Sequence, residues 1–290
     1  MNKAKEQRLK KIVEGIVGLP TLPSVVTTIT KMMQNPRVSA AQIGKVIQSD
    51  VALTSKILKL VNSAFYGFPN RISTVTHAIV ILGFNAVKST AMSVSVFESF
   101  GKGKGEEVID RVGFWKHSIG CAAAARVIAK WLNMRELEEA FIAGLLHDIG
   151  LLILDQFIHD EFVKIVNYAR EKDVLLRDAE KAVLDGITHN DLGAWLGRKW
   201  NLAPSLIEVI ETYPNPSSAS SNYQLICIVH VADIFVRALD IGDPGDKRMP
   251  NINKSAWNKL GLKDEDLPSI FKEIIESTNK AQEFLKMVNK

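Results

Sequence analysis

The sequence predicts an all-α protein. Apolar residues recur three and four positions apart in almost every segment, which is the spacing that produces one buried face of a helix. Residues that cap helix starts precede these segments, and glycine, proline or asparagine follow them. The chain has 290 residues, of which 47% are hydrophobic, so it can bury a continuous core. We therefore expect one large or two ordinary helical domains.

Five helices are expected in the first hundred residues. Ser24 is placed to cap the first, which should end before Pro36 because the residue preceding a proline avoids the helical conformation. Ser39 and Gln42 have the spacing of a capping box at the start of the second helix, and Asp50 is placed to cap the third. The fourth and fifth helices are expected at about Ser73–Leu82 and Asn85–Phe100.

The clearest linker in the sequence is Gly101–Gly105. Its three glycines are costly to order, and its two lysines favour water. The segment lacks the preceding strand and the GxxxxGK[ST] spacing of a phosphate-binding loop. We therefore place a boundary here and divide the chain into an N-terminal helical part (1–104), a helical core (105–240) and a C-terminal helical extension (241–290).

Eight further helices are expected between this linker and residue 240. Their approximate ranges are Ile109–Leu132, Arg135–His147, Leu151–Phe157, Glu161–Glu171, Asp178–Leu184, Asn190–Trp200, Pro204–Thr212 and Tyr223–Leu239. A helical pair should follow the loop 242–250. Its apolar residues, among them Ile270, Ile274 and Phe284, could pack on the core or mediate a dimer, because periodicity does not separate these outcomes.

Composition argues against several classes of function. No apolar stretch approaches the roughly 20 residues of a spanning helix, and the Lys-rich start lacks the apolar centre of a signal peptide, so we expect a cytoplasmic protein without membrane contact. A formal net charge of +4 with scattered lysines predicts no nucleic-acid partner. Cys121 and Cys227 lie in apolar helical patterns without CxxC spacing, so we expect buried reduced thiols without a chemical role.

The tetrad His147-Asp148-Ile149-Gly150, at the end of an apolar run, is the most informative motif. Neighbouring helical residues point roughly 100° apart, so this His and Asp can reach one ion only from a helix end. Gly150 is a candidate for the residue that ends the helix.

Two more polar residues are placed in apolar helical patterns. His117 is followed by small residues that leave space beside it, and Asp233 lies in the series Leu225 to Val236. An ionised Asp left unpaired in a core costs several kcal/mol, so Asp233 should meet a metal, a basic side chain or several donors. A buried hydrogen-bonded polar network without metal remains the alternative.

The ordered set His117, His147, Asp148 and Asp233 resembles the ligand set of the HD metal-dependent phosphohydrolase superfamily. The resemblance implies that these four residues bind one divalent metal. Two imidazoles and two carboxylates suit iron, manganese, zinc or nickel. In active members the metal polarises a phosphate oxygen and activates a water molecule.

Several segments narrow the resemblance to the HDOD domain family over about Leu19–Leu239. They are Leu19-Pro20-Thr21-Leu22-Pro23, Gln48–Leu53, Val61–Gly67, Ala78–Gly83, Gly193–Leu196 and Trp200–Pro204. The resemblance implies an all-α HD-like architecture in which an N-terminal helical subdomain packs on an HD-type helical core. It also implies a signalling or regulatory role, because many members have lost part of the metal site.

The sequence departs from the related HD-GYP phosphodiesterases. Leu151 stands where they carry a Lys after HDIG, and of three further histidines only His189 is matched, since Tyr213 and Pro214 occupy the positions of a His pair. We expect His189 to be an additional ligand or to line the pocket. His230, one turn before Asp233, has the same two options or could donate a hydrogen bond to that carboxylate.

Two functions follow from this resemblance. The first is a non-catalytic signal-transduction module with a residual metal or small-ligand site and helical surfaces for a signalling protein partner. The second is a metal-dependent phosphohydrolase acting on a nucleotide or cyclic dinucleotide. A nucleotide or phosphate ligand is compatible with both, and the oligomeric state is left open.

Overall fold

The computed structural model describes residues 3–100, 108–246 and 248–288, and these contain helices and no strand. The all-α prediction is confirmed. The N-terminal helices are α1 (Lys3–Glu14), α2 (Ser24–Met32), α3 (Ala40–Gln48), α4 (Val51–Val61), α5 (Val75–Leu82) and α6 (Phe84–Phe100). The others are α7 (Arg111–Trp131), α8 (Leu137–Leu146), α9 (Ile149–Phe157), α10 (His159–Lys172), α11 (Leu176–Val183), α12 (His189–Lys199), α13 (Pro204–Thr212), α14 (Tyr223–Ala238), α15 (Lys254–Leu260) and α16 (Leu267–Val288).

The local start signals fix most of the N-terminal helices. Ser39 and Gln42 form the predicted capping box of α3, and the Asp50 carboxylate accepts a hydrogen bond from the Leu53 backbone N–H at the start of α4. The prediction for Ser24 was wrong by one position. Ser24 is the first helical residue of α2, and Pro23 is the capping residue.

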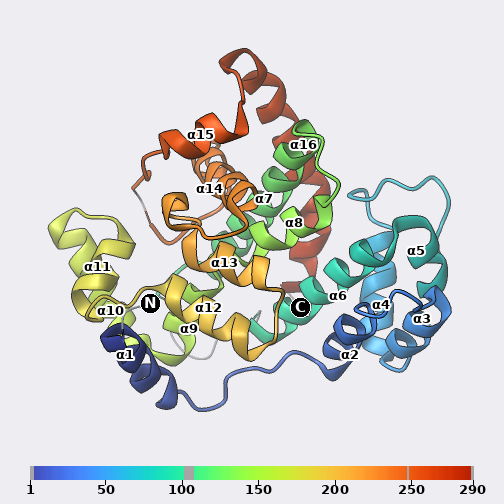
Figure 1. Cartoon of the computed structure of the whole chain (residues 1–290), viewed down its shortest axis with the longest axis horizontal. Coiled ribbons are helices and arrows are strands. Elements are labelled where there is room, and N and C mark those ends of the chain that lie inside the picture. Colours follow the sequence, from blue (N-terminus) through green and yellow to red (C-terminus); the bar gives the residue numbers. More distant parts are fainter. Residues whose placement is uncertain (1–2, 101–107, 247, 289–290) are drawn as a thin grey trace.

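One helix, α1, was not predicted, because its few apolar residues are separated by lysines. Leu9 and Val13 form its buried face. The Lys5 ammonium lies 2.8 Å from the Asp191 carboxylate at the start of α12, and Arg8 donates a hydrogen bond to the Asp185 carbonyl. These contacts hold α1 against the start of α12 and the loop before it, which are far from α1 in sequence (Figure 1).

The centre of the molecule is α7, which packs against α8, α14 and α16 (Figure 1). Helices α2 to α5 form a lobe to one side, which contacts the rest mainly through α6. Of the two alternatives for the C-terminal pair, α16 packs back on the core, with Ile270 and Ile274 fully buried. Phe284 lies outside the side chains that the structure describes.

No single helix in the described ranges is long and apolar enough to cross a membrane.

The predicted linker, residues 101–105, and the boundary at residue 104 lie outside the described residues. The chain segments on either side of it are held by Asp155 in α9. The Asp155 carboxylate accepts a hydrogen bond from the Val108 backbone N–H at 3.0 Å and pairs with the buried Arg111 guanidinium, which also reaches the Phe100 carbonyl. This buried ion pair therefore joins the end of α6, the start of α7 and α9.

The loop before α14 is held in place by one carboxylate, that of Glu208 in α13. It accepts hydrogen bonds from the backbone N–H groups of Ser220, Ser221 and Asn222 at 2.6–3.0 Å. Burial opposes ionisation, but these hydrogen bonds outweigh it and lower the pKa of Glu208 to about 2.

We expect Glu208→Gln to lower the free energy of unfolding by about 1 kcal/mol at neutral pH, since a charged acceptor of several donors is lost. A pKa lowered on folding stabilises the fold above the unfolded value of about 4.3, and this contribution is lost as pH falls through about 2. In urea unfolding, the loss of unfolding free energy relative to wild type should therefore be smaller at pH 3 than at pH 7. Glu171→Gln, on the exposed end of α10, is the control; an equal loss in both variants would contradict the assignment.

Candidate metal centre

The His147-Asp148 dipeptide lies at a break between two helices. Helix α8 ends at Leu146, His147 keeps helical angles as the residue after it, and Asp148 precedes α9. The expected helix end is present, but Gly150 does not form it, because Gly150 is the second residue of α9. Its role is close packing, since a Cβ atom on Gly150 would lie 1.8 Å from the carbonyl oxygen of His189. Glycine thus lets the start of α12 approach α9.

Four buried side chains from three helical segments converge at the centre of the molecule. They are His117 and Cys121 of α7, His147 after α8, and Asp233 of α14. One donor atom from each lies within 4.8 Å of all the others. Nε2 of His117 is 3.0 Å from Oδ1 of Asp233 and 3.4 Å from the Cys121 sulfur, and Nε2 of His147 is 3.9 Å from the same Asp233 oxygen.

Cys121 is the member of this cluster that the sequence prediction missed. It was expected to be a buried thiol without a chemical role, and it is indeed buried. One signal was present in the sequence, because Cys121 follows His117 by four residues and so lies on the same helix face.

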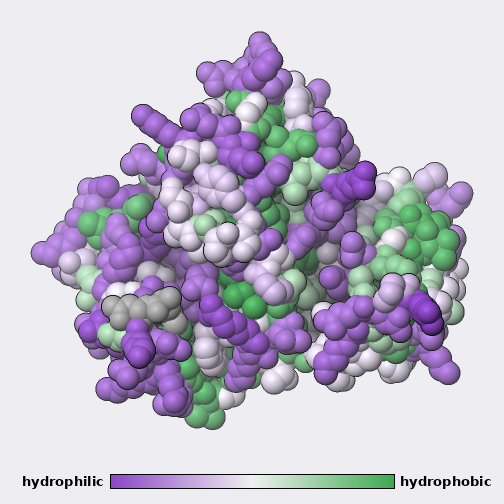
Figure 2. Space-filling view, in the orientation of Figure 1, coloured by the Kyte–Doolittle hydropathy of each residue, from purple (hydrophilic) through white to green (hydrophobic). Residues whose placement is uncertain are grey.

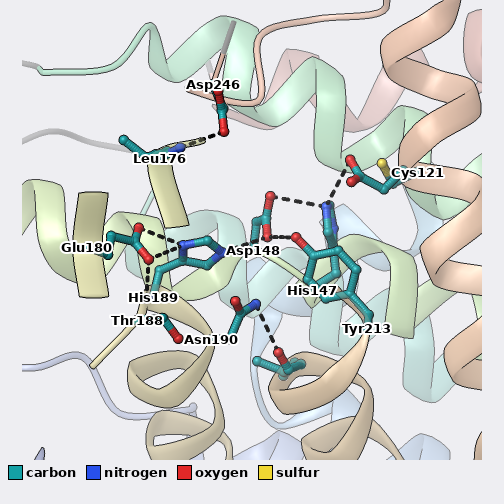
Figure 3. Close-up of polar contacts among 12 residues, drawn as sticks. Cys121, His147, Asp148, Leu176, Glu180, Thr188, His189, Asn190, Tyr213 and Asp246 are labelled. Carbon is teal, nitrogen blue, oxygen red and sulfur yellow. Dashed lines mark hydrogen bonds and ion pairs between the residues drawn. The ribbon is translucent and has the colours of Figure 1, made fainter. Parts of the chain in front are cut away.

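Asp148 lies next to this cluster, and its two carboxylate oxygens face different partners (Figure 3). Oδ2 is 3.2 Å from Nε2 of His147. Oδ1 accepts a hydrogen bond from the Tyr213 hydroxyl at 2.5 Å and lies 3.3 Å from Nε2 of His189. Tyr213, which the sequence identified only as a departure from catalytic relatives, is therefore a buried donor to the HD motif.

His189 bridges two buried carboxylates, those of Asp148 and Glu180 (Figure 3). Its Nδ1 is 2.7 Å from Glu180 Oε1, and its backbone N–H donates to Glu180 Oε2 at 2.9 Å. Burial lowers the pKa of the imidazole, but Glu180 and Asp148 outweigh burial and raise it to about 10. The two carboxylates thus favour the protonated form of His189. No signal in the sequence pointed to Glu180, which has an ordinary position in a short amphipathic helix.

Both ring nitrogens of His230 make hydrogen bonds, so neither is available as a metal ligand. Nδ1 donates to the Tyr213 carbonyl at 3.0 Å, and Nε2 accepts from the Asn253 backbone N–H at 2.9 Å. A hydrogen bond from His230 to Asp233, one of the options for this residue, is not formed, because both ring nitrogens have these other partners. His230 instead ties the end of α13 to the start of α15.

Asp233 has a basic partner one turn along α14. Nε of Arg237 donates to Oδ1 of Asp233 at 2.8 Å. Burial raises the pKa of this carboxyl, but Arg237, His117 and His147 outweigh burial and hold it well below its usual range. The carboxylate is ionised and compensated, as expected for a charge in the core. Arg237 was not singled out in the sequence, although its spacing from Asp233 is that of a helical ion pair.

The donor set of the cluster fits a transition metal. It supplies two imidazole nitrogens, a sulfur and a carboxylate oxygen. Nδ1 of His147 is 2.7 Å from the Gly144 carbonyl, which places the ring proton on Nδ1 and the lone pair on Nε2. This Nε2 atom is buried and makes no hydrogen bond to the described residues, so it is available as a ligand. The buried cluster could therefore bind a metal.

Comparison with known proteins agrees with this fold. The family model of the HDOD domain matches residues 19–216, within the expected range Leu19–Leu239. An uncharacterized protein of Treponema pallidum (strain Nichols) is 28% identical over 233 residues, which cover 79% of this chain and 44% of that protein. The chain thus spans less than half the length of this curated relative.

Three solved structures share the fold. An HDOD domain protein of unknown function from Geobacter sulfurreducens superposes with a TM-score of 0.83 at 23% identity, covering 97% of this chain and 98% of its own. A Shewanella amazonensis SB2B protein described as a candidate phosphohydrolase has a TM-score of 0.73 at 22% identity, with coverages of 99% and 98%. A candidate signal transduction protein from Marinobacter aquaeolei VT8 has a TM-score of 0.78 at 21% identity, with coverages of 99% and 66%. Together with the match of the family model over more than half of the chain, these findings show that the chain belongs to the HDOD domain family.

Proposed function

We propose that this HDOD protein is a non-catalytic signalling module whose buried HD-type site holds one divalent transition metal. The observation that carries the proposal is the closure of the site. His117, Cys121 and His147 are fully buried and Asp233 is 3% exposed. A hydrolytic metal needs an open position for water and substrate. A closed site favours a metal that holds helices together.

One neighbouring side chain supports this interpretation, because the Tyr213 hydroxyl donates a hydrogen bond to Asp148, the carboxylate of the HD motif. Leu151, which replaces the Lys of the catalytic relatives, is buried in α9. A bound metal would supply a positive centre among His117, Cys121, His147 and Asp233, and these residues would then link α7, α8 and α14.

A metal that links these helices would favour one packing of the core and so bias the affinity of the protein for a partner. The N-terminal lobe offers a surface for a signalling protein. Val51 at the start of α4 and Val80 and Ile81 at the end of α5 are exposed, and Figure 2 shows a hydrophobic area over this lobe. Exposed apolar groups of this kind are typical of protein interaction sites.

The first test is elemental analysis of the 290-residue chain purified without added metal. We expect about one transition-metal ion per chain in wild type and in the control Asp160→Ala, which changes an exposed carboxylate of α10. Asp233→Ala should lose the metal, because it removes a ligand and leaves Arg237 without its carboxylate. Metal-free wild-type protein that also takes up no added zinc or iron would contradict the proposal and favour a polar network.

The alternative is a metal-dependent phosphohydrolase acting on a nucleotide or cyclic dinucleotide. One observation favours it, the buried chain Glu180–His189–Asp148, which places an imidazole with a favoured protonated form beside the HD motif where a phosphate could be bound. We expect no phosphate release across a panel of nucleotides and cyclic dinucleotides with added zinc, iron or manganese. Metal-dependent release that is lost in His147→Ala would establish the hydrolase instead.

A further inference from the structure

We propose that Cys121 is the fourth ligand of the metal and that Asp148 is a positioning residue outside the coordination shell. The resulting site consists of His117, Cys121, His147 and Asp233. This inference rests on the proposed metal-binding function and assigns its ligand set. It differs from the set that the sequence predicted, in which Asp148 takes the place of the cysteine.

The crossing of α7 and α8 brings Cys121 into the site. A Cβ atom on Gly144 would lie 2.6 Å from the Cys121 carbonyl oxygen, so the backbones of the two helices are in contact at this point. The next turn of α8 then places His147 beside the cysteine sulfur. His117 is one turn before Cys121 on α7, with its Nε2 atom 3.4 Å from that sulfur. Helix α7 and the end of α8 thus place donor atoms of His117, Cys121 and His147 close together.

Contacts around the cluster distinguish His147 from Asp148. The Gly144 carbonyl accepts a hydrogen bond from Nδ1 of His147, so that Nε2, which lies 3.9 Å from Oδ1 of Asp233, is the coordinating nitrogen. Asp148 is not among the four residues whose donor atoms all lie within 4.8 Å of one another, although its Oδ2 atom is 3.2 Å from Nε2 of His147. Its other oxygen is engaged with Tyr213 and His189, and coordination by that oxygen would break the hydrogen bond to the buried Tyr213 hydroxyl.

The thiol has consequences for metal choice and for chemistry. Cys121 would bind a metal as the thiolate, so metal uptake would release its thiol proton to solvent. A thiolate with two imidazoles and one carboxylate favours zinc or iron over manganese and magnesium. Four protein ligands are the number found in structural zinc sites, whereas catalytic zinc sites use three and keep one position for water.

Cobalt(II) is the probe that tests this ligand set, because a thiolate ligand gives a charge-transfer absorption in the near ultraviolet that nitrogen and oxygen ligands do not give. We expect the metal-free 290-residue chain to take up one Co²⁺ ion and to show this band. Asp148→Asn should keep the band. Cys121→Ser should lose it and bind Co²⁺ at least about tenfold more weakly, and Cys227→Ser, which changes the other buried cysteine, should behave as wild type.

The outcomes separate this inference from the proposed function. Stoichiometric Co²⁺ uptake without the band, or a band that persists in Cys121→Ser, would overturn the role of Cys121 and leave metal binding intact. Loss of stoichiometric Co²⁺ uptake in Asp148→Asn would return Asp148 to the ligand set. No uptake by wild type would overturn both proposals. Circular dichroism of each metal-free variant verifies that a lost band does not reflect a lost fold.

Discussion

Replacing Gly150 by alanine is expected to lower the free energy of unfolding by about 3 kcal/mol or more. The added methyl group would lie 1.8 Å from the His189 carbonyl oxygen and 2.9 Å from the Gly193 backbone nitrogen. Both atoms belong to the backbone of α12, so no side-chain rotation relieves the contact. Alanine favours a helix interior by about 1 kcal/mol relative to glycine, which is too little to offset a clash of this size.

Denaturant unfolding of Gly150→Ala measures this effect, and Gly197→Ala is the matched control. Gly197 is also helical and lies on α12, but a Cβ atom there would meet the Ile207 side chain at 3.2 Å, and that side chain can move. We expect a change below about 1 kcal/mol in the control. The close-packing role of Gly150 is refuted if the two variants unfold at the same denaturant concentration.

The role of Gly150 shows where local sequence reasoning reaches its limit. Glycine is common both after the last residue of a helix and where two backbones touch, and the sequence around HDIG is compatible with either. The sequence located the break correctly, since α8 ends just before His147. It could not show that α9 begins immediately after Asp148 or that α12 crosses it, because that crossing is fixed by contacts between residues about forty positions apart.

The helices themselves were predictable because their signals are local. Ser39 and Asp50 cap α3 and α4 through bonds that reach only three residues along the chain. By contrast, α1 was missed because its buried face is small and its position depends on Asp185 and Asp191 in the distant α11–α12 region. Periodicity detects a helix only where its buried face is wide enough to stand out.

The residues of the candidate site were likewise predictable where their signals are local and missed where they depend on the tertiary fold. His117, His147 and Asp233 were identifiable because each is a polar residue in an apolar helical pattern, and the structure brings all three together. Cys121 was passed over because a buried thiol is ordinary in a core. Its place in the cluster depends on how closely α8 approaches α7. Glu180 was missed because only the tertiary fold brings it to His189.

The buried pair of Arg111 and Asp155 leads to the other large effect that we expect. Asp155→Ala should lower the free energy of unfolding by about 3–5 kcal/mol, because it removes one partner of a buried ion pair. It also removes the acceptor of the Val108 backbone N–H. Asp155→Asn should be less damaging, since its amide oxygen still accepts that hydrogen bond, although the charge is lost.

Thermal and urea unfolding of the two variants, with Asp173→Asn as the control, measure this effect. Asp173 forms an exposed pair with Arg248, and asparagine tolerates its left-handed backbone conformation, so the control should change stability little. The order Asp155→Ala, Asp155→Asn, Asp173→Asn from most to least destabilised is the expected result, and equal stabilities would contradict it. Because Asp155 lies on α9, which begins immediately after the positioning residue Asp148, a loosened α9 should in addition weaken Co²⁺ binding. Metal affinity that stays unchanged in Asp155→Ala would contradict the positioning role of Asp148.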